Sequence, residues 1–192
     1  MIPGTLAKVT AKTAAEICKH FTLDEGPQKL LDAKHTPKQL LELLREKGFY
    51  PDAIKVLAYG MPKREAVWWA CVCVRSAAGT VIPPPALKAL QAAEKWVADP
   101  SEANRVANLS AGGAAGFSTA AGCAALAAYW SAGSHVPTHV DVKPPPDQWT
   151  AHAVSGCVLM AAIQTEPEKA FEKFQKHFEL GVAVANGTSQ WK

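Results

Sequence analysis

The chain has 192 residues, of which 48% are hydrophobic and 19% are charged, and its formal net charge is +3. This length is enough for one domain with a sizeable core, and the apolar fraction with so few charges excludes a disordered chain. The net charge is too small, and the Lys and Arg residues are too scattered, to indicate a nucleic-acid partner.

Helix signals recur from the first residues onward, and no strand pattern of convincing length occurs. Thr13 and Glu16 form a predicted capping box at the start of a short helix. Thr36, followed by proline, predicts the start of a second helix, which Gly48 ends. Residues 54–61 predict another short helix, so the first third of the chain is helical but divided into short pieces.

The most apolar predicted helix begins at residues 62–65 and ends near Arg75 and Gly79. Its body, AVWWACVCV, is hydrophobic on all sides, which predicts a position at the centre of the domain. A proline triplet at 83–85 precedes the next helix, whose apolar positions within 86–97 fall on one face. A turn at 99–101 starts a further helical segment.

The segment 101–134 contains too much glycine for one straight helix, so a break is expected at the glycines of 112–113 or at Gly116. Ser118 or Thr119 can cap the second half. Most of this segment lacks charged side chains. Because alanine and glycine dominate it and give little driving force for membrane insertion, we predict a closely packed internal helix pair and no membrane span.

Residues 134–146, SHVPTHVDVKPPP, form the longest stretch without helical character. Asp147 is the predicted cap of a helix that continues to Ile163. A last helix is predicted from about Thr165, with its phenylalanines at helical spacing.

Together these signals predict an all-α fold, an irregular multi-helix bundle of about nine helices that forms a single domain over residues 1–192. A short α-solenoid is the alternative, although no repeat of about 33 to 45 residues is convincing. Residues 1–35 are expected to pack less tightly than the rest.

The five cysteines lie in apolar helical stretches, and their number is odd. This pattern is typical of buried, reduced thiols in a cytoplasmic protein and not of a disulfide framework. Cys71 and Cys73 have the spacing C-x-C, which makes their side chains diverge by about 200° on a helix. They are therefore not expected to share a metal or to form a disulfide.

The candidate zinc ligands are His135, His139, His152 and Cys157, since zinc needs three or four such groups. Pro137 separates the first two histidines and disfavours the helical pairing that their spacing would otherwise permit. The simpler interpretation is two loop histidines and two unrelated helical residues. We therefore expect no metal and no cofactor.

The sequence contains no motif for nucleophilic catalysis or phosphate binding. It has no G-x-S-x-G elbow and no H-E-x-x-H, and its GGAAG run lacks the Lys-Ser/Thr ending of a P-loop. Acidic pairs such as Asp24 with Glu25 are surface neighbours. We therefore expect that the protein is not an enzyme.

The first candidate protein-binding group lies at the start of the most apolar helix. Arg and Trp are favoured at binding hot spots. Adjacent tryptophans point in different directions on a helix, so either Trp68 or Trp69 can reach the surface while the other packs in the core. Core packing of each is the simpler interpretation. The group consists of Lys63, Arg64, Glu65 and Trp69.

The second candidate protein-binding group flanks or belongs to the non-helical stretch at 134–146. Long ordered loops on a rigid scaffold often carry function, although a plain crossover between helices is equally compatible with the pattern. The group consists of Trp130, His135, His139 and Trp149.

Three stretches carry a resemblance: MPKREAVWWACVCVRSA (61–77), LQAAEKWVADPSEANRVA (90–107) and AALAAYWSAGS (124–134). Together they resemble a bacterial family of Ala-rich, all-helical proteins of unknown function, over roughly residues 35 to 187. The family is associated with type VI secretion gene neighbourhoods. The resemblance implies a cytoplasmic accessory protein that binds another protein, and it implies no catalytic residues.

Three hypotheses follow from these observations. The first is a non-enzymatic adaptor or chaperone for a type VI secretion effector or a component of its delivery machinery. The second is an immunity protein that neutralises a cognate toxin, although such inhibitors usually present a charged or sharply shaped face and the net charge here is small. The third is a metal-binding protein or enzyme that uses His135, His139 and His152.

Overall fold

The computed structural model describes residues 1–79, 81–131 and 146–191 of the chain. These residues form ten α-helices and one 3-10 helix, and no strand occurs among them, so the predicted all-α fold is confirmed. The helix that the sequence did not predict is α2, Glu25–Gln28, a single turn too short to carry a periodic signal. In chain order the others are α1 (Ala14–Cys18), α3 (Pro37–Glu46), α4 (Tyr50–Gly60), α5 (Lys63–Ala77), α6 (Pro84–Ala98), α7 (Glu102–Ala115), α8 (Ala120–Tyr129), α9 (Gln148–Ile163), the 3-10 helix η1 (Pro167–Lys169) and α10 (Ala170–Ala185).

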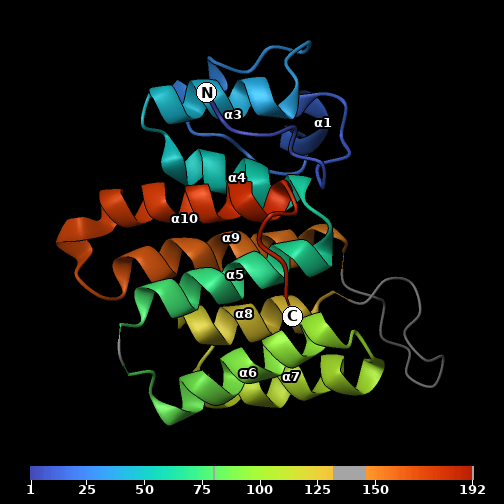
Figure 1. The fold of residues 1–192 in the computed structure, drawn as a ribbon, viewed down its shortest axis with the longest axis vertical. Helices are drawn as coiled ribbons and strands as arrows, with labels where there is room; N and C mark the ends of the chain where they lie inside the picture. Colours follow the sequence, from blue (N-terminus) through green and yellow to red (C-terminus); the bar gives the residue numbers. More distant parts are fainter. Residues whose placement is uncertain (80, 132–145, 192) are drawn as a thin grey trace.

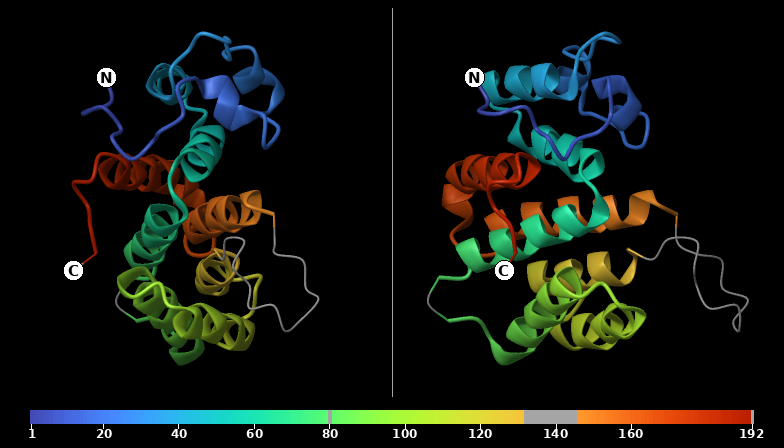
Figure 2. Two further views of the ribbon diagram at one scale, coloured as in Figure 1. Left: turned by 90° about the vertical axis from the view of Figure 1, so that its right-hand side faces the viewer. Right: turned by 45° about the vertical axis from the view of Figure 1, so that its right-hand side comes forward.

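The helices are stacked in successive layers along the long axis of the molecule (Figure 1). The short N-terminal helices and α3 lie at one end, and the α6–α7 pair lies at the other, as two further views agree (Figure 2). Between them α5 packs against α6, α8, α9 and α10, which confirms the central position predicted for the most apolar helix. No helix formed by the described residues combines the length and the apolar character needed to cross a membrane.

The starts of the first helices follow the predicted capping residues. Thr36 and Gln39 form a complete capping box at α3. At α1, the Thr13 hydroxyl accepts the backbone N–H of Glu16. The Glu16 carboxylate accepts from the backbone of Lys12 at 3.0 Å and not from that of Thr13, so the predicted box is half formed.

The glycine-rich segment breaks at Gly116, one of the two predicted positions. Gly116 has a φ of +83°, which L side chains rarely adopt, and it ends α7. Thr119 then caps α8 by accepting the backbone N–H of Gly122 at 3.1 Å. The glycines at 112–113 stay inside α7, where the ring of Phe117 folds back against them.

The N-terminal segment is fastened to the last helix. Ile2 and Leu6 are fully buried, although the sequence predicts less tight packing for residues 1–35. The backbone N–H of Leu6 donates to Asn186 Oδ1 at 2.8 Å, and that of Lys8 donates to the carbonyl oxygen of Ala185 at 2.8 Å. This segment therefore contributes apolar side chains to the same core as the later helices.

The centre of the core is the crossing of α5 and α10. Trp69 is fully buried, and its indole N–H donates to the carbonyl oxygen of His177 at 2.9 Å. Where α10 passes this ring it carries Gly181. A Cβ at that position would lie 2.7 Å from the Trp69 ring and 3.0 Å from Leu57 of α4. The close approach of the helices therefore depends on the missing side chain.

We predict that Gly181→Ala destabilises the fold by about 1–3 kcal/mol, because the new methyl group overlaps a fixed indole ring in a close-packed core. Gly156→Ala in α9 is the matched control, since a Cβ there meets nothing within 4 Å. The control should stabilise by about 0.5–1 kcal/mol through helix propensity. Urea unfolding of both variants measures the difference, and equal effects of the two substitutions would contradict this account of the crossing.

His177 is a buried titratable group between α9 and α10. Its Nδ1 lies 3.2 Å from the carbonyl oxygen of Val158, so Nδ1 carries the proton of the neutral ring. Burial is the main cause that lowers the pKa of His177 below its usual 6.5, and Lys176 and Lys173 nearby act in the same direction. The folded state therefore binds fewer protons at this site than the unfolded chain does.

The consequence is a loss of stability at acidic pH. Because the folded pKa is the lower one, the contribution of neutral His177 is fully present above about pH 6.5 and is lost progressively as the pH falls below it. Replacing the ring in His177→Gln should flatten the dependence of the unfolding free energy on pH in this window, whatever its effect at neutral pH. Chemical denaturation at a series of pH values gives both slopes, and parallel slopes would show that His177 does not titrate on unfolding.

Candidate functional site

The predicted site residue Lys63 lies at the start of α5 and joins it to the start of α9. Lys63 Nζ lies 2.8 Å from Asp147 Oδ1. Asp147 stands at the predicted helix start, but its carboxylate does not cap the helix, which corrects the role that the sequence assigns to it. The carboxylate instead forms an ion pair with Lys63 at one side of a pocket.

Arg64 and Glu65 are bound to other parts of the chain. Arg64 donates to the carbonyl oxygens of Val97 at 2.6 Å and Ala98 at 3.0 Å, which are free because they end α6. Its guanidinium also lies over the ring of Trp191, 4.3 Å from the centroid. Glu65 forms an ion pair of 3.2 Å with Lys8. The two side chains thus hold α6 and both terminal segments against α5.

Of the two adjacent tryptophans, one is buried in the core and the other reaches the surface, as the helix geometry predicts. The inclusion of Trp69 among the binding residues is wrong, because Trp69 is the buried one. Trp69 has no exposed surface, because the crossing with α10 covers it. Trp68 is the one that reaches the surface, half-buried at the edge of the core. The sequence could not decide between them, since the helix body from Ala66 to Val74 is apolar at every position and shows no polar face that would fix its rotation.

The structure brings two other predicted residues together, Trp130 after α8 and Trp149 in the first turn of α9. Their ring centroids are 5.0 Å apart in an edge-to-face arrangement. Trp149 is 44% exposed, so a large part of its apolar ring system faces water. The other two members of the second group, His135 and His139, lie outside the described residues.

The predicted metal ligands that the structure describes do not converge. His152 is exposed on α9, whereas Cys157 is fully buried with its Sγ 3.9 Å from the carbonyl oxygen of Ala70. In the part of the chain that the structure describes, no three His, Cys, Asp or Glu side chains are grouped as metal ligands would be. Since His135 and His139 lie outside that part, the metal hypothesis stays a prediction.

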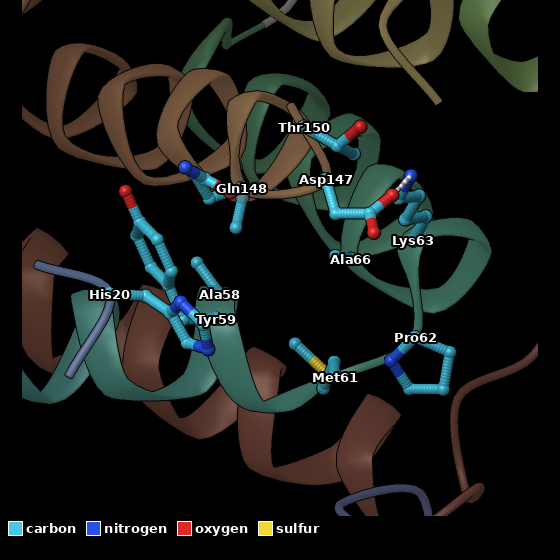
Figure 3. A pocket seen from close by; sticks show the side chains of 11 residues that line it. His20, Ala58, Tyr59, Met61, Pro62, Lys63, Ala66, Asp147, Gln148 and Thr150 are labelled. Atoms are coloured by element: carbon cyan, nitrogen blue, oxygen red, sulfur yellow. Dashed lines mark hydrogen bonds and ion pairs between the residues drawn. The ribbon is translucent and has the colours of Figure 1, made fainter. Parts of the chain in front are cut away.

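A pocket of about 210 Å³ lies where α4 ends and where α5 and α9 begin (Figure 3). Its lining is apolar where α4 leads into α5, at Met61 and Pro62, and polar at the rim. His20 and Tyr59 stand on one side of the cavity, and the Lys63–Asp147 ion pair stands on the other (Figure 3). The remaining lining residues are Ala58, Ala66, Gln148, Thr150 and Ala151.

Two polar groups at the rim of this pocket, Asp147 and Tyr59, are suited to ion pairing and hydrogen bonding. The hydrogen bond from Lys63 lowers the pKa of Asp147, so this carboxylate is ionised and paired near neutral pH. Burial raises the pKa of Tyr59, so the phenol keeps its proton and can donate or accept a hydrogen bond. Neither group is tuned toward the operating pH of a general acid or base.

Sequence reasoning missed His20, Tyr59, Met61 and Gln148. No motif joins His20 and Gln148 to Tyr59 and Met61, because these three parts of the chain are distant in sequence and become neighbours only through tertiary packing. The one local signal is the helix end near Gly60, which places the residues just before and after it at a turn. Such a position is where a pocket rim can form, but nothing in the spacing shows what lies opposite.

In the folded chain the cysteine thiols are poorly reactive as nucleophiles. Burial raises the pKa of Cys71, Cys73 and Cys157 well above the usual value, and it raises that of Cys18 to about 11. Cys123 is the half-exposed one, and its pKa is also raised by burial. Thiols in this state remain protonated and are weak nucleophiles.

We predict that a thiol reagent such as Ellman's reagent modifies Cys123 slowly in the native protein and leaves the four buried cysteines unmodified. Unfolding in guanidinium should release all five thiols. If Cys123 is the thiol that reacts in the folded protein, Cys123→Ala should abolish the reaction under native conditions. A rapid native reaction of several thiols would show that the core around α5 opens readily.

Comparison with known proteins identifies a family and no closer relative. A sequence profile matches residues 40–185, and the family that it describes is a family of unknown function (DUF6931). No curated protein and no solved structure matches the chain. The matched range includes α5, α9 and the rim residues Tyr59, Lys63 and Asp147, whereas His20 precedes it.

Proposed function

The chain belongs to DUF6931, a family of unknown function, and we propose that it is a non-enzymatic accessory factor that binds another protein through the pocket and the adjacent Trp130–Trp149 pair. The observation that carries the proposal is the exposure of Trp149 in the same helical turn that lines the pocket. Tryptophan is among the residues most enriched at binding hot spots.

The size of the pocket favours a side chain over a metabolite. Its volume of about 210 Å³ is below the range of about 300–1,000 Å³ that is typical of small-molecule sites. One large apolar side chain of a partner fits such a space. The apolar lining at Met61 and Pro62 would receive that side chain. The polar rim at Tyr59 and Gln148 would contact the partner's backbone.

The chemistry of the first turn of α9 supports a docking role. Gln148 lines the pocket, and Trp149 packs against Trp130 on a neighbouring face. Asp147 is neutralised by Lys63, so the rim does not repel a partner of either charge. A partner that covers Trp149 would remove apolar area from water, which is the main favourable term in association.

The finer proposal is that the partner belongs to type VI secretion, as an effector or a component of the delivery machinery, with this protein as its adaptor or chaperone. An immunity protein is less well supported, because toxin inhibitors usually present a strongly charged or protruding face. Here the rim carries an internally closed ion pair and an aromatic pair beside a shallow pocket.

The test is capture of partners from the native host by the whole protein and by two tryptophan variants. Trp149→Ala should reduce the recovery of the specific partner at least about tenfold, because truncation of a hot-spot residue costs about 2 kcal/mol or more. Trp191→Ala is the matched control, since this tryptophan is partly exposed over Arg64 and away from the pocket. Mass spectrometry quantifies the partner in each sample.

The outcomes separate the alternatives. Recovery of a secretion effector or secretion component that depends on Trp149 supports the adaptor role. A toxin whose lethality is relieved by co-expression would assign an immunity role instead. Failure to recover any specific partner under several conditions, or equal recovery by both variants, would count against this site.

A further inference from the structure

α7 is turned so that three of its polar side chains point inward. Asn104, Arg105 and Asn108 are buried, although these residue types usually face water. Arg105 donates to the carbonyl oxygen of Tyr129 at 2.5 Å at the end of α8. Asn108 donates to the carbonyl oxygen of Ala92 at 3.2 Å on α6. These bonds to two neighbouring helices fix which face of α7 is exposed.

Beyond Glu102 in its first turn, the exposed face of α7 is consequently apolar and uncharged. Val106 is 47% exposed, Leu109 is 41% exposed, and Phe117 just beyond the helix is 41% exposed. The other exposed positions of this face are small: Ala103, Ala107, Ser110, Gly113 and Ala114. A surface helix normally shows the opposite pattern, with polar residues outward, so an apolar outer face indicates a surface that another molecule covers.

Charge favours a second copy of the chain as that molecule. The sequence has no Asp, Glu, Lys or Arg from Val106 to Ser131, so two identical faces can meet without like-charge repulsion although the chain is net positive. The charges nearest the face on α7, Glu102 and Arg105, already pair with each other at 2.7 Å. A strongly charged partner would find no complementary group on this face.

Side-chain size also favours a second copy. We propose that two copies of the chain pack α7 against α7 in antiparallel orientation, about a twofold axis near Ser110. In that register the larger Val106 of one copy faces the smaller Ala114 of the other. The twofold axis repeats this contact, so Ala114 of the first copy also faces Val106 of the second. The small residues allow close approach of the two helices, as small interface residues do wherever helices pack tightly.

Phe117 fits the same arrangement. Its ring lies against Gly112 and Gly113, where a Cβ at position 112 would come within 2.8 Å of the ring. The ring therefore stands about level with Gly113, which this register places opposite Ala107 of the second copy. The two Glu102 side chains would lie about 24 Å apart along the helix, well beyond the screening length in physiological salt.

The expected dimer is weak. A single helix pair buries about 1,200 Å² or less in total, which is the lower end of specific interfaces. Self-association should therefore depend on concentration. Sedimentation velocity of the full chain from micromolar to near-millimolar concentration should show a monomer that converts to a dimer.

Matched charge substitutions locate the interface. Val106→Glu places two carboxylates in it and should shift the dissociation constant upward at least about tenfold, because burying an unpaired charge is costly. Val81→Glu is the control, since Val81 is 77% exposed in the segment between α5 and α6, outside the helix that forms the proposed interface, and receives the same change. Circular dichroism checks that both variants remain folded.

A cysteine at the axis tests the register. In a Cys123→Ala background, Ser110→Cys should form a disulfide-linked dimer under a mild copper oxidant, because the two residues meet at the axis within disulfide reach. Ala103→Cys should not, since the two copies of residue 103 lie about 21 Å apart in this register. Both positions are exposed in the single chain.

The proposal fails if the chain is monomeric at every concentration. It also fails if Val106→Glu and Val81→Glu affect the dimer equally, or if Ala103→Cys cross-links as efficiently as Ser110→Cys. A monomer that loses capture of a different protein on Val106→Glu would assign the face to that protein and overturn self-association.

Discussion

The crossing of α5 and α10 at Trp69 is the contact on which the other helix positions depend. Gly181 lets α10 pass directly over the indole ring, and the indole N–H is satisfied by the carbonyl oxygen of His177. The ring of His177 in turn bonds to the carbonyl oxygen of Val158 in α9. One buried chain of contacts therefore sets three helices relative to one another. A buried polar network of this kind rigidifies a core because every member must keep its partner.

The candidate site follows from that arrangement. With α5 and α9 fixed side by side, their first turns lie next to each other, and Lys63 reaches Asp147. The turn between α4 and α5 brings Met61 beneath the ion pair and Tyr59 to the opposite wall. The pocket is thus a product of where helices begin and end, and its size is limited by the closeness of their packing. This limit is why the pocket suits one side chain and not an extended ligand.

Much of the fold could be predicted from the sequence because capping is local. The hydroxyls of Thr36 and Ser101 each accept a backbone N–H of the helix that follows, so these residues mark a helix start through contacts within a few residues. The structure confirms both helix starts. The rotation of a helix is not local. The body of α5 is apolar all round, so nothing in the sequence distinguished Trp68 from Trp69. The pocket could not be foreseen either, since Tyr59 and Asp147 meet only through tertiary packing.

α7 shows a further limit of periodicity and connects the two surfaces. Asn and Arg side chains usually face solvent, but Arg105 and Asn108 are buried because main-chain carbonyls of α8 and α6 accept their hydrogen bonds. The carbonyl that Arg105 holds belongs to Tyr129, the residue before Trp130. The guanidinium that turns the apolar face of α7 outward therefore also fixes the end of α8, next to Trp130 of the aromatic pair. Loss of Arg105 would disturb both the exposed face of α7 and the Trp130–Trp149 pair. A substitution at Val106 acts only on the first surface, and one at Trp149 acts only on the second. The exposed positions are therefore the informative ones to vary.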